Sequence, residues 1–219
     1  MLCKKTYNRL KIKIKEYTPS SFGEGNQQRV LPVRSVNTPH QRLERDSMET
    51  LIKNGWVIDG TGAEKYRADV LIRDEKIVKI GGDIDVQSRH VIDADGCFVM
   101  PGFIDTHSHS DIEILSRPAL EPKIRQGITT EILGQDGVSV VPVPRKHLNE
   151  WKKNIAGLDG DGANINWSFR NTQEYLDALE NTGINSNVAY LAPHGNIRLE
   201  VMGWDDREAT DDEIEKMKN

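Results

Sequence analysis

The pattern of the sequence changes at Pro101, and this change constrains the fold more than any other feature. Before Pro101, short apolar runs alternate with turn residues. After it, apolar strands alternate with stretches of helical spacing. The first pattern is typical of antiparallel hairpins, and the second is typical of parallel β/α units. The sequence therefore predicts an α/β protein in which a small sheet precedes a β/α segment.

Residues 51–99 predict an antiparallel sheet of short strands. Apolar runs occur at residues 51–52, 57–58, 68–72 and 76–80. Arg73-Asp74-Glu75-Lys76 separates the last two runs and predicts a hairpin turn. A sheet of about 50 residues is too small to be stable without a packing partner.

Residues 101–219 predict three parallel strands with their helices. The expected strands are residues 98–105, 128–133 and 187–192, and the expected helices are residues 119–126, residues 146–156, a helix capped by Asn171 with Glu174, and a helix capped by Thr210 with Glu213. A parallel sheet must be covered on both faces or closed into a barrel. A (β/α)8 TIM-like barrel needs about 250 residues. The sequence therefore predicts an incomplete barrel that is truncated at Asn219.

Charge divides the chain near Met48. Residues 1–47 carry a net charge of +6, and residues 48–219 carry −11. The basic segment has little to bury, which favours a disordered extension over a nucleic-acid-binding arm. The acidic body gives no reason to expect a nucleic-acid partner. No apolar run reaches the roughly 18–20 residues that span a bilayer, and no secretory signal is present, so no membrane partner and a cytoplasmic location are expected.

Two histidines follow the strand that begins the β/α segment. His107 and His109 are two residues apart, and in an extended segment this spacing points both imidazoles to the same side. The carboxyl end of a parallel strand is where barrel active sites lie. The pair predicts a metal site, in which the carboxylates of Asp105 and Asp111 are expected to orient the rings.

Several motifs together resemble the opening of the amidohydrolase superfamily. They are residues 54–62, 68–72, 101–109, 126–134 and 193–198, in that order. Within the superfamily, the sequence is most similar to the N-acyl-D-amino-acid deacylases, also called D-aminoacylases. The resemblance covers about residues 50 to 205.

The resemblance implies a fold and a chemistry. Residues 48–100 would form the N-terminal part of a β-sandwich, and residues 101–219 the first part of a metal-dependent hydrolase barrel. His107 and His109 would bind Zn²⁺ or another divalent metal, and the substrate would be a small-molecule N-acyl amino acid. In the family, the general base and the other metal-binding histidines come from later strands, beyond Asn219, so this chain alone is expected to be inactive. The sequence specifies no oligomeric state.

Three further residues are assigned by the resemblance. D-aminoacylases usually have a cysteine ligand after the second strand, where this chain has Asp136. Asp136 would bind zinc, bind a harder metal, or be an ordinary turn aspartate. His194 and Arg198 lie in a segment that resembles the family's substrate-facing loop, where Arg198 would bind a substrate carboxylate or make only a surface contact.

Two other functions stay open from the sequence. A dihydroorotase-like or hydantoinase-like cyclic amidohydrolase shares the His-X-His opening. A non-catalytic fragment would bind a partner chain through an exposed edge strand.

Overall fold

The computed structural model describes residues 30–31, 49–74, 76–88, 90–160, 162 and 165–218. They form two compact units: the sheet unit, within residues 49–102, and the β/α unit, within residues 30–31 and 103–218. The extension predicted for residues 1–47 lies outside the described residues, except for residues 30–31. In the described part of the chain, no helix is long and apolar enough to cross a membrane.

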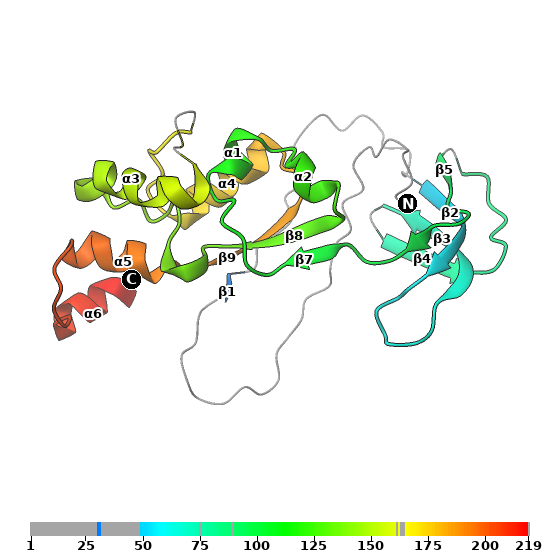
Figure 1. Ribbon diagram of the computed structural model, residues 1–219, viewed down its shortest axis with the longest axis horizontal. Helices are drawn as coiled ribbons and strands as arrows, with labels where there is room; N and C mark the ends of the chain where they lie inside the picture. Colours follow the sequence, from blue (N-terminus) through cyan, green and yellow to red (C-terminus); the bar gives the residue numbers. More distant parts are fainter. Residues whose placement is uncertain are drawn as a thin grey trace. The chain divides into compact units, whose positions relative to one another are not determined.

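The sheet unit is a five-stranded mixed sheet (Figure 1). Its strands are β2 (Glu49–Val57), β3 (Tyr66–Arg73), β4 (Lys76–Gly81), β5 (His90–Asp93) and β6 (Phe98–Val99). The predicted antiparallel pairing is confirmed for β2, β3 and β4. It is wrong for β5 and β6, which both pair with β2 in parallel.

The return of the chain after β4 explains the parallel pairs. Ile84 lies in this connection, and its side chain is buried against Leu51 and Leu71. Its backbone N–H donates to Asp69 Oδ2 over 2.9 Å. The connection therefore brings the chain back to the start of β2, where His90 pairs with Thr50. Turn residues in the sequence mark such a connection but do not reveal its direction.

The single strand predicted at residues 98–105 is wrong. The chain forms β6 before Pro101 and β7 (Phe103–Asp105) after it, in two different sheets. Proline has no N–H to donate to a ladder, so Pro101 separates the two strands.

The β/α unit contains a four-stranded sheet in the order β1-β9-β8-β7. Strands β7, β8 (Ile128–Leu133) and β9 (Asn187–Leu191) are parallel, as predicted. The short strand β1 (Val30–Leu31) pairs antiparallel with β9. The mixed α/β content that the sequence predicts is confirmed, with β7 at one edge of this sheet.

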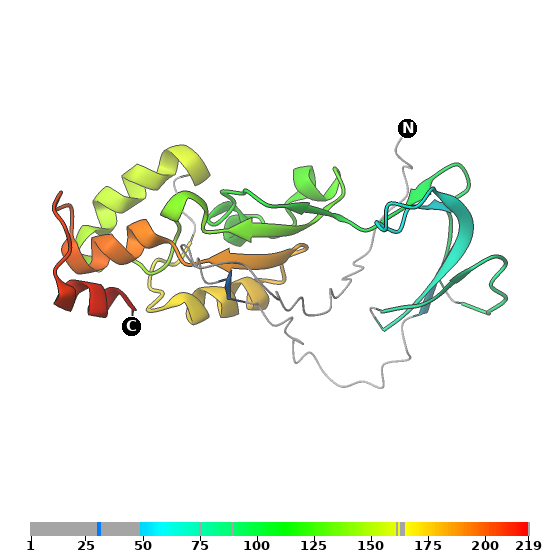
Figure 2. The same ribbon diagram turned by 90° about the horizontal axis from the view of Figure 1, so that it is seen from below.

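Six α-helices and two short 3₁₀ helices are described in this unit. They are α1 (Glu113–Ser116), α2 (Glu121–Ile124), η1 (Gln135–Gly137), η2 (Arg145–His147), α3 (Leu148–Asp159), α4 (Thr172–Thr182), α5 (His194–Met202) and α6 (Asp211–Lys218). The helix predicted at residues 119–126 is only one turn, α2, because Leu120 has a left-handed φ of 40° before it. Figure 2 shows α5 and α6 packed side by side after β9.

Both predicted caps form, with one difference. Thr210 and Glu213 make a reciprocal capping box, with bonds of 3.3 Å from Glu213 N to Thr210 Oγ1 and 2.9 Å from Thr210 N to Glu213 Oε2. Asn171 accepts from Glu174 N over 3.0 Å. The Glu174 carboxylate, however, accepts from the N–H of Arg170, one residue before the position that the capping box predicts.

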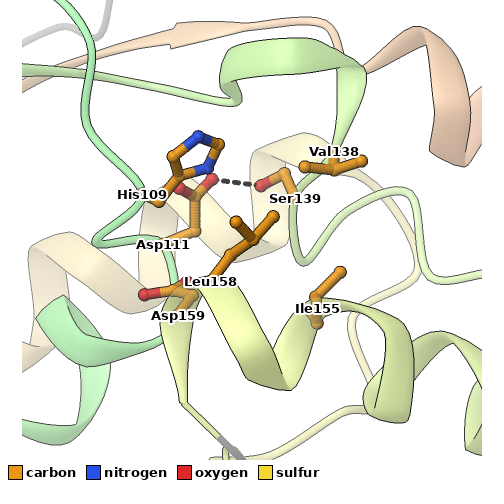
Figure 3. A pocket seen from close by; sticks show the side chains of 7 residues that line it. All are labelled: His109, Asp111, Val138, Ser139, Ile155, Leu158 and Asp159. Atoms are coloured by element: carbon orange, nitrogen blue, oxygen red, sulfur yellow. Dashed lines mark hydrogen bonds between the residues drawn. The ribbon is translucent and has the colours of Figure 1, made fainter.

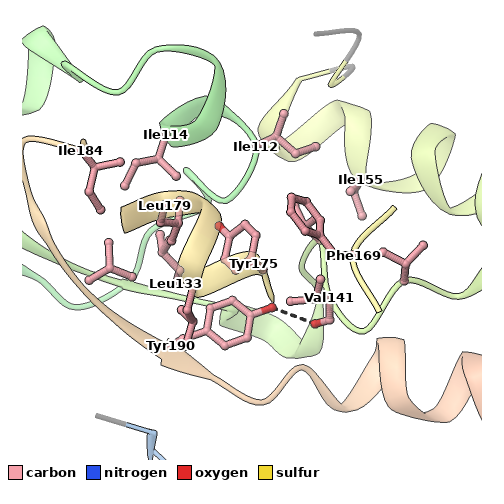
Figure 4. Packing of buried hydrophobic residues seen from close by; sticks show 14 of the residues in the cluster. Ile112, Ile114, Leu133, Val141, Ile155, Phe169, Tyr175, Leu179, Ile184 and Tyr190 are labelled. Atoms are coloured by element: carbon pink, nitrogen blue, oxygen red, sulfur yellow. Dashed lines mark hydrogen bonds between the residues drawn. The ribbon is translucent and has the colours of Figure 1, made fainter. Parts of the chain in front are cut away.

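The core of the β/α unit lies between strands β8 and β9 and helices α1, α3 and α4 (Figure 4). Leu133, Tyr175 and Tyr190 are fully buried at its centre. The Tyr190 hydroxyl donates to the carbonyl oxygen of Val141 over 2.8 Å, so this buried polar group is satisfied. The core fixes the end of β8, from which the candidate site begins.

We expect Leu133→Ala to lower the free energy of unfolding by about 2–5 kcal/mol, because it leaves a cavity in a closely packed core. The matched control is Leu158→Ala, since the Leu158 side chain is 55% exposed; it should change stability by about 0.5 kcal/mol or less. Urea unfolding followed by circular dichroism measures both. Equal losses in the two variants would contradict the packing described.

Candidate metal centre

Parallel pairing brings two separate segments to one edge of the sheet. Strand β7 ends at Asp105, which pairs with Glu131 near the end of β8. His107 and His109 follow β7, and η1 follows β8. Since both strands run in the same direction, the residues that follow them lie close together.

His107, His109 and Asp136 form a three-residue cluster there. Asp136 Oδ2 lies 3.2 Å from His107 Nε2 and 2.9 Å from His109 Nε2. The two imidazole rings have centroids 5.3 Å apart. One nitrogen or oxygen from each side chain lies within 4.8 Å of the others. The structure thus brings together the three residues that the sequence assigns to a metal.

The turn that carries Asp136 is held by close packing. A Cβ atom on Gly134 would lie 2.3 Å from the Leu191 carbonyl oxygen, so only glycine fits there. Asp136 has a left-handed φ of 54°, which aspartate tolerates better than most residues. The Gln135 side-chain amide donates to the Thr106 carbonyl oxygen over 2.8 Å. This bond ties the turn to the segment that carries both histidines.

The donor set fits a divalent metal ion such as zinc. Imidazole nitrogen and carboxylate oxygen are both common zinc ligands, and catalytic zinc usually has three protein ligands and one open position. Ligand atoms of a tetrahedral zinc site lie about 3.3 Å apart, close to the separations from Asp136. The hydrogen bond from His109 holds the pKa of Asp136 below its usual value, so the carboxylate is ready to bind a cation. The side chains of His107 and Asp136 are 58% and 61% exposed, so one side of the cluster is open to solvent.

The contacts of Asp105 and Asp111 are with groups other than the imidazole rings, so their role in orienting the rings stays a prediction. Asp105 accepts from the Lys123 ammonium over 3.0 Å and from the backbone N–H of His107 over 3.3 Å. Asp111 is buried and accepts from the Gly134 N–H over 3.0 Å and from the Ser139 hydroxyl. Among the bonds found for described residues, neither carboxylate meets an imidazole. Both instead hold the backbone on either side of the cluster.

A small pocket adjoins His109 (Figure 3). It is lined by His109, Asp111, Val138, Ser139, Ile155, Leu158 and Asp159. Burial raises the pKa of Asp111 to about 6. Burial also raises the pKa of Asp159 to about 8, and the nearby Asp111 charge adds to the rise. Two carboxyl groups that resist ionisation therefore line the wall beside a candidate metal ligand.

His194 and Arg198 are placed differently from each other. His194 is the first residue of α5, and its side chain is exposed. The backbone of His194 lies against Gly137 of η1. Arg198 donates to the carbonyl oxygens of Asp205 and Arg207 over 2.9 and 2.7 Å. These contacts agree with the surface role that the sequence left open for Arg198, since its guanidinium holds the loop after α5. A substrate-binding role for Arg198 stays a prediction.

The sequence analysis did not identify three buried or half-buried residues near the cluster, which are Asn196, Glu131 and Lys123. Asn196 is fully buried and donates to the Ser139 and Pro142 carbonyl oxygens over 2.8 and 2.9 Å. Glu131 is fully buried on β8, where it pairs with Lys123. A charged residue within the strand Ile128–Leu133 was the one signal that the sequence offered for Glu131.

Comparison with known proteins shows the family to which the chain is similar. A protein-family model described as the amidohydrolase family matches residues 90–219. The chain is 36% identical to D-aminoacylase of Alcaligenes xylosoxydans xylosoxydans over 171 residues, which cover 78% of this chain and 34% of that protein. It is 39% identical to N-acyl-D-glutamate deacylase of the same organism over 158 residues, which cover 72% of this chain and 31% of that protein.

A solved structure shows the same similarity. N-acyl-D-glutamate deacylase from Bordetella bronchiseptica, complexed with zinc and a phosphonate inhibitor, matches with a TM-score of 0.67 and 36% identity. The match covers 79% of this chain and 35% of that one. This chain spans about a third of the length of these relatives.

The raised pKa of Asp159 predicts a pH dependence of stability. The folded state keeps the Asp159 proton up to about pH 8, whereas an unfolded aspartate loses its proton near 3.8. This group favours folding most below pH 3.8, and its contribution is lost as the pH rises to about 8. As the pH rises from 6 to 8, we expect the stability of Asp159→Asn to increase relative to that of the wild type. This range lies above the pKa of Asp111, which is about 6. Urea unfolding at several pH values measures this, and parallel pH profiles would contradict it.

Proposed function

Because this chain belongs to the amidohydrolase family, we propose that it carries part of the active site of a metal-dependent hydrolase that cleaves non-peptide C–N bonds. The observation that carries the proposal is the cluster of His107, His109 and Asp136. It lies at the carboxyl ends of parallel strands, which is the face where barrel enzymes place their chemistry.

The proposed fold context is a TIM-like (β/α)8 barrel beside a β-sandwich. The parallel strands β7, β8 and β9 support the start of a barrel in residues 101–219. The sheet unit supports a β-sandwich contribution from residues 48–100, since β4 and β5 leave apolar side chains exposed. These side chains are Ile77, Val78, Ile80, Val91 and Ile92. Because successive side chains of a strand point to opposite sides, these residues lie on both faces of the two edge strands, where further packing would cover them.

The metal would be zinc or another divalent cation. When bound, it would lower the pKa of a water molecule and polarise the substrate carbonyl. His107 and His109 would each present Nε2, and Asp136 would present an anionic oxygen that balances part of the cation's charge. The turn of η1 and the bond from Gln135 to Thr106 would keep these donors in place before metal binds. The exposed side of the cluster would admit water and substrate.

The proposed substrate is an N-acyl-D-amino acid. Hydrolysis would break the amide C–N bond, with the water oxygen joining the acyl carbon to give a carboxylate and with a proton passing to the released amino group. The two deacylases named above support this class over cyclic amides. His194 is proposed to face the substrate, because it begins α5 directly beside the η1 turn.

Removing the carboxylate of Asp136 should weaken metal binding. We expect Asp136→Asn to lower Co²⁺ affinity more than about tenfold, the effect of losing about 1.4 kcal/mol of binding free energy. Asp136→Cys should bind Co²⁺ with a new thiolate charge-transfer band. The control is Asp205→Asn, which changes a similarly exposed aspartate paired with Arg207. Titration followed by absorption spectroscopy measures all three, and equal affinity in Asp136→Asn would remove Asp136 from the site.

The substrate class is tested on the native protein purified from its source with zinc. We expect release of free amino acid from N-acetyl-D-amino acids and little from the L isomers. His109→Ala should abolish this release, because it removes a metal ligand. Hydrolysis of hydantoins or dihydroorotate, without hydrolysis of N-acyl-D-amino acids, would contradict the deacylase proposal and favour a cyclic amidohydrolase.

A further inference from the structure

Glu131 is a fully buried carboxylate beneath the histidine segment. Its Oε2 accepts from the hydroxyls of Ser108 and Ser110, each over 2.8 Å. Its Oε1 accepts from the Ser186 hydroxyl over 3.2 Å. Burying an unpaired carboxylate costs several kcal/mol, so this group depends on its partners. Two of those partners belong to the segment that carries the candidate metal ligands.

Side chains in this segment alternate between two directions. Ser108 and Ser110 are 3% and 6% exposed and face Glu131. The side chains of His107 and His109 are 58% and 20% exposed and meet Asp136. In extended backbone, successive side chains point to opposite sides. Holding the two serines against Glu131 therefore directs both imidazoles toward the other side.

This support is needed because the strand has already ended. Strand β7 stops at Asp105, so the segment from Thr106 to Ser110 lies beyond the described ladder with β8. The carboxylate of Glu131 replaces the ladder as the link between the two segments. It sits on β8 opposite Asp105, the last residue of β7.

Lys123 of α2 completes the connection. Its ammonium contacts the Glu131 carboxylate and the Ser108 hydroxyl, and it donates to Asp105 over 3.0 Å. Asp105 in turn accepts from the backbone N–H of His107 over 3.3 Å. The lysine balances the charge of the buried glutamate and joins both ends of the same short segment.

We propose that Glu131, paired with Lys123, is a positioning residue of the metal centre that holds Ser108 and Ser110 so that His107 and His109 present Nε2 to one cation. This inference rests on the proposed metal site. Glu131 itself does not contact the metal. Its role is to fix the direction of the imidazoles before the metal arrives, which lowers the ordering cost of binding.

The test compares Co²⁺ affinity and the visible Co²⁺ spectrum of the full 219-residue chain and its variants. Ser108→Ala with Ser110→Ala removes both links to Glu131 and leaves the Glu131–Lys123 pair intact. Ser186→Ala is the matched control, because it removes one buried serine from the same carboxylate but from outside the histidine segment. Glu131→Gln is compared with Glu121→Gln, whose side chain is 68% exposed. Thermal unfolding without metal reports whether each variant folds.

We expect the double serine variant and Glu131→Gln to bind Co²⁺ about 10–100-fold more weakly, the usual effect of removing a group that orients a ligand. Both should also change the Co²⁺ spectrum, whereas Ser186→Ala and Glu121→Gln should match the wild type. If Glu131→Gln does not fold, the double serine variant decides the outcome. Wild-type affinity and spectrum in a folded double variant would overturn the positioning role while leaving the metal site in place. Failure of the wild type to bind Co²⁺ would overturn the metal site and this role together.

Discussion

Parallel pairing of β7 with β8 is the constraint on which the candidate site depends. It sets Asp105 opposite Glu131, so the segments that follow the two strands leave the sheet at the same edge. Antiparallel pairing would send them to opposite ends of the sheet. The close approach of Gly134 to Leu191 then fixes the η1 turn against β9. Asp136 reaches both histidines only because these two conditions hold together.

Two buried acidic side chains lie in the core of the β/α unit near the candidate site. Glu131 and Asp111 are carboxylates with almost no exposed surface, and each is surrounded by hydrogen-bond donors. Replacing such groups with apolar ones is often neutral or stabilising, so their contribution to stability does not explain their presence. Their partners are the backbone and side chains on either side of the cluster. We infer that these carboxylates order the site at some cost to stability.

Local sequence signals predicted the parts of the fold that depend on neighbouring residues. The caps at Asn171 and Thr210 and the strands β8 and β9 follow from short-range patterns, and the structure contains them. The His-X-His spacing and the resemblance identified the residues that cluster. Long-range features were not accessible: the parallel pairing of β5 with β2 and the bond between Glu131 and Ser186 both join residues that are distant in the sequence. Residue type and spacing do not encode such pairs.

The proposed site requires that one cation binds between His107, His109 and Asp136. A crystal structure of the chain soaked in zinc, with anomalous data collected at the zinc absorption edge, tests it most directly. We expect one strong anomalous peak about 2.0–2.2 Å from an imidazole nitrogen of each histidine and from a carboxylate oxygen of Asp136. A strong peak elsewhere, or a zinc ion bound by only one of the three residues, would contradict it.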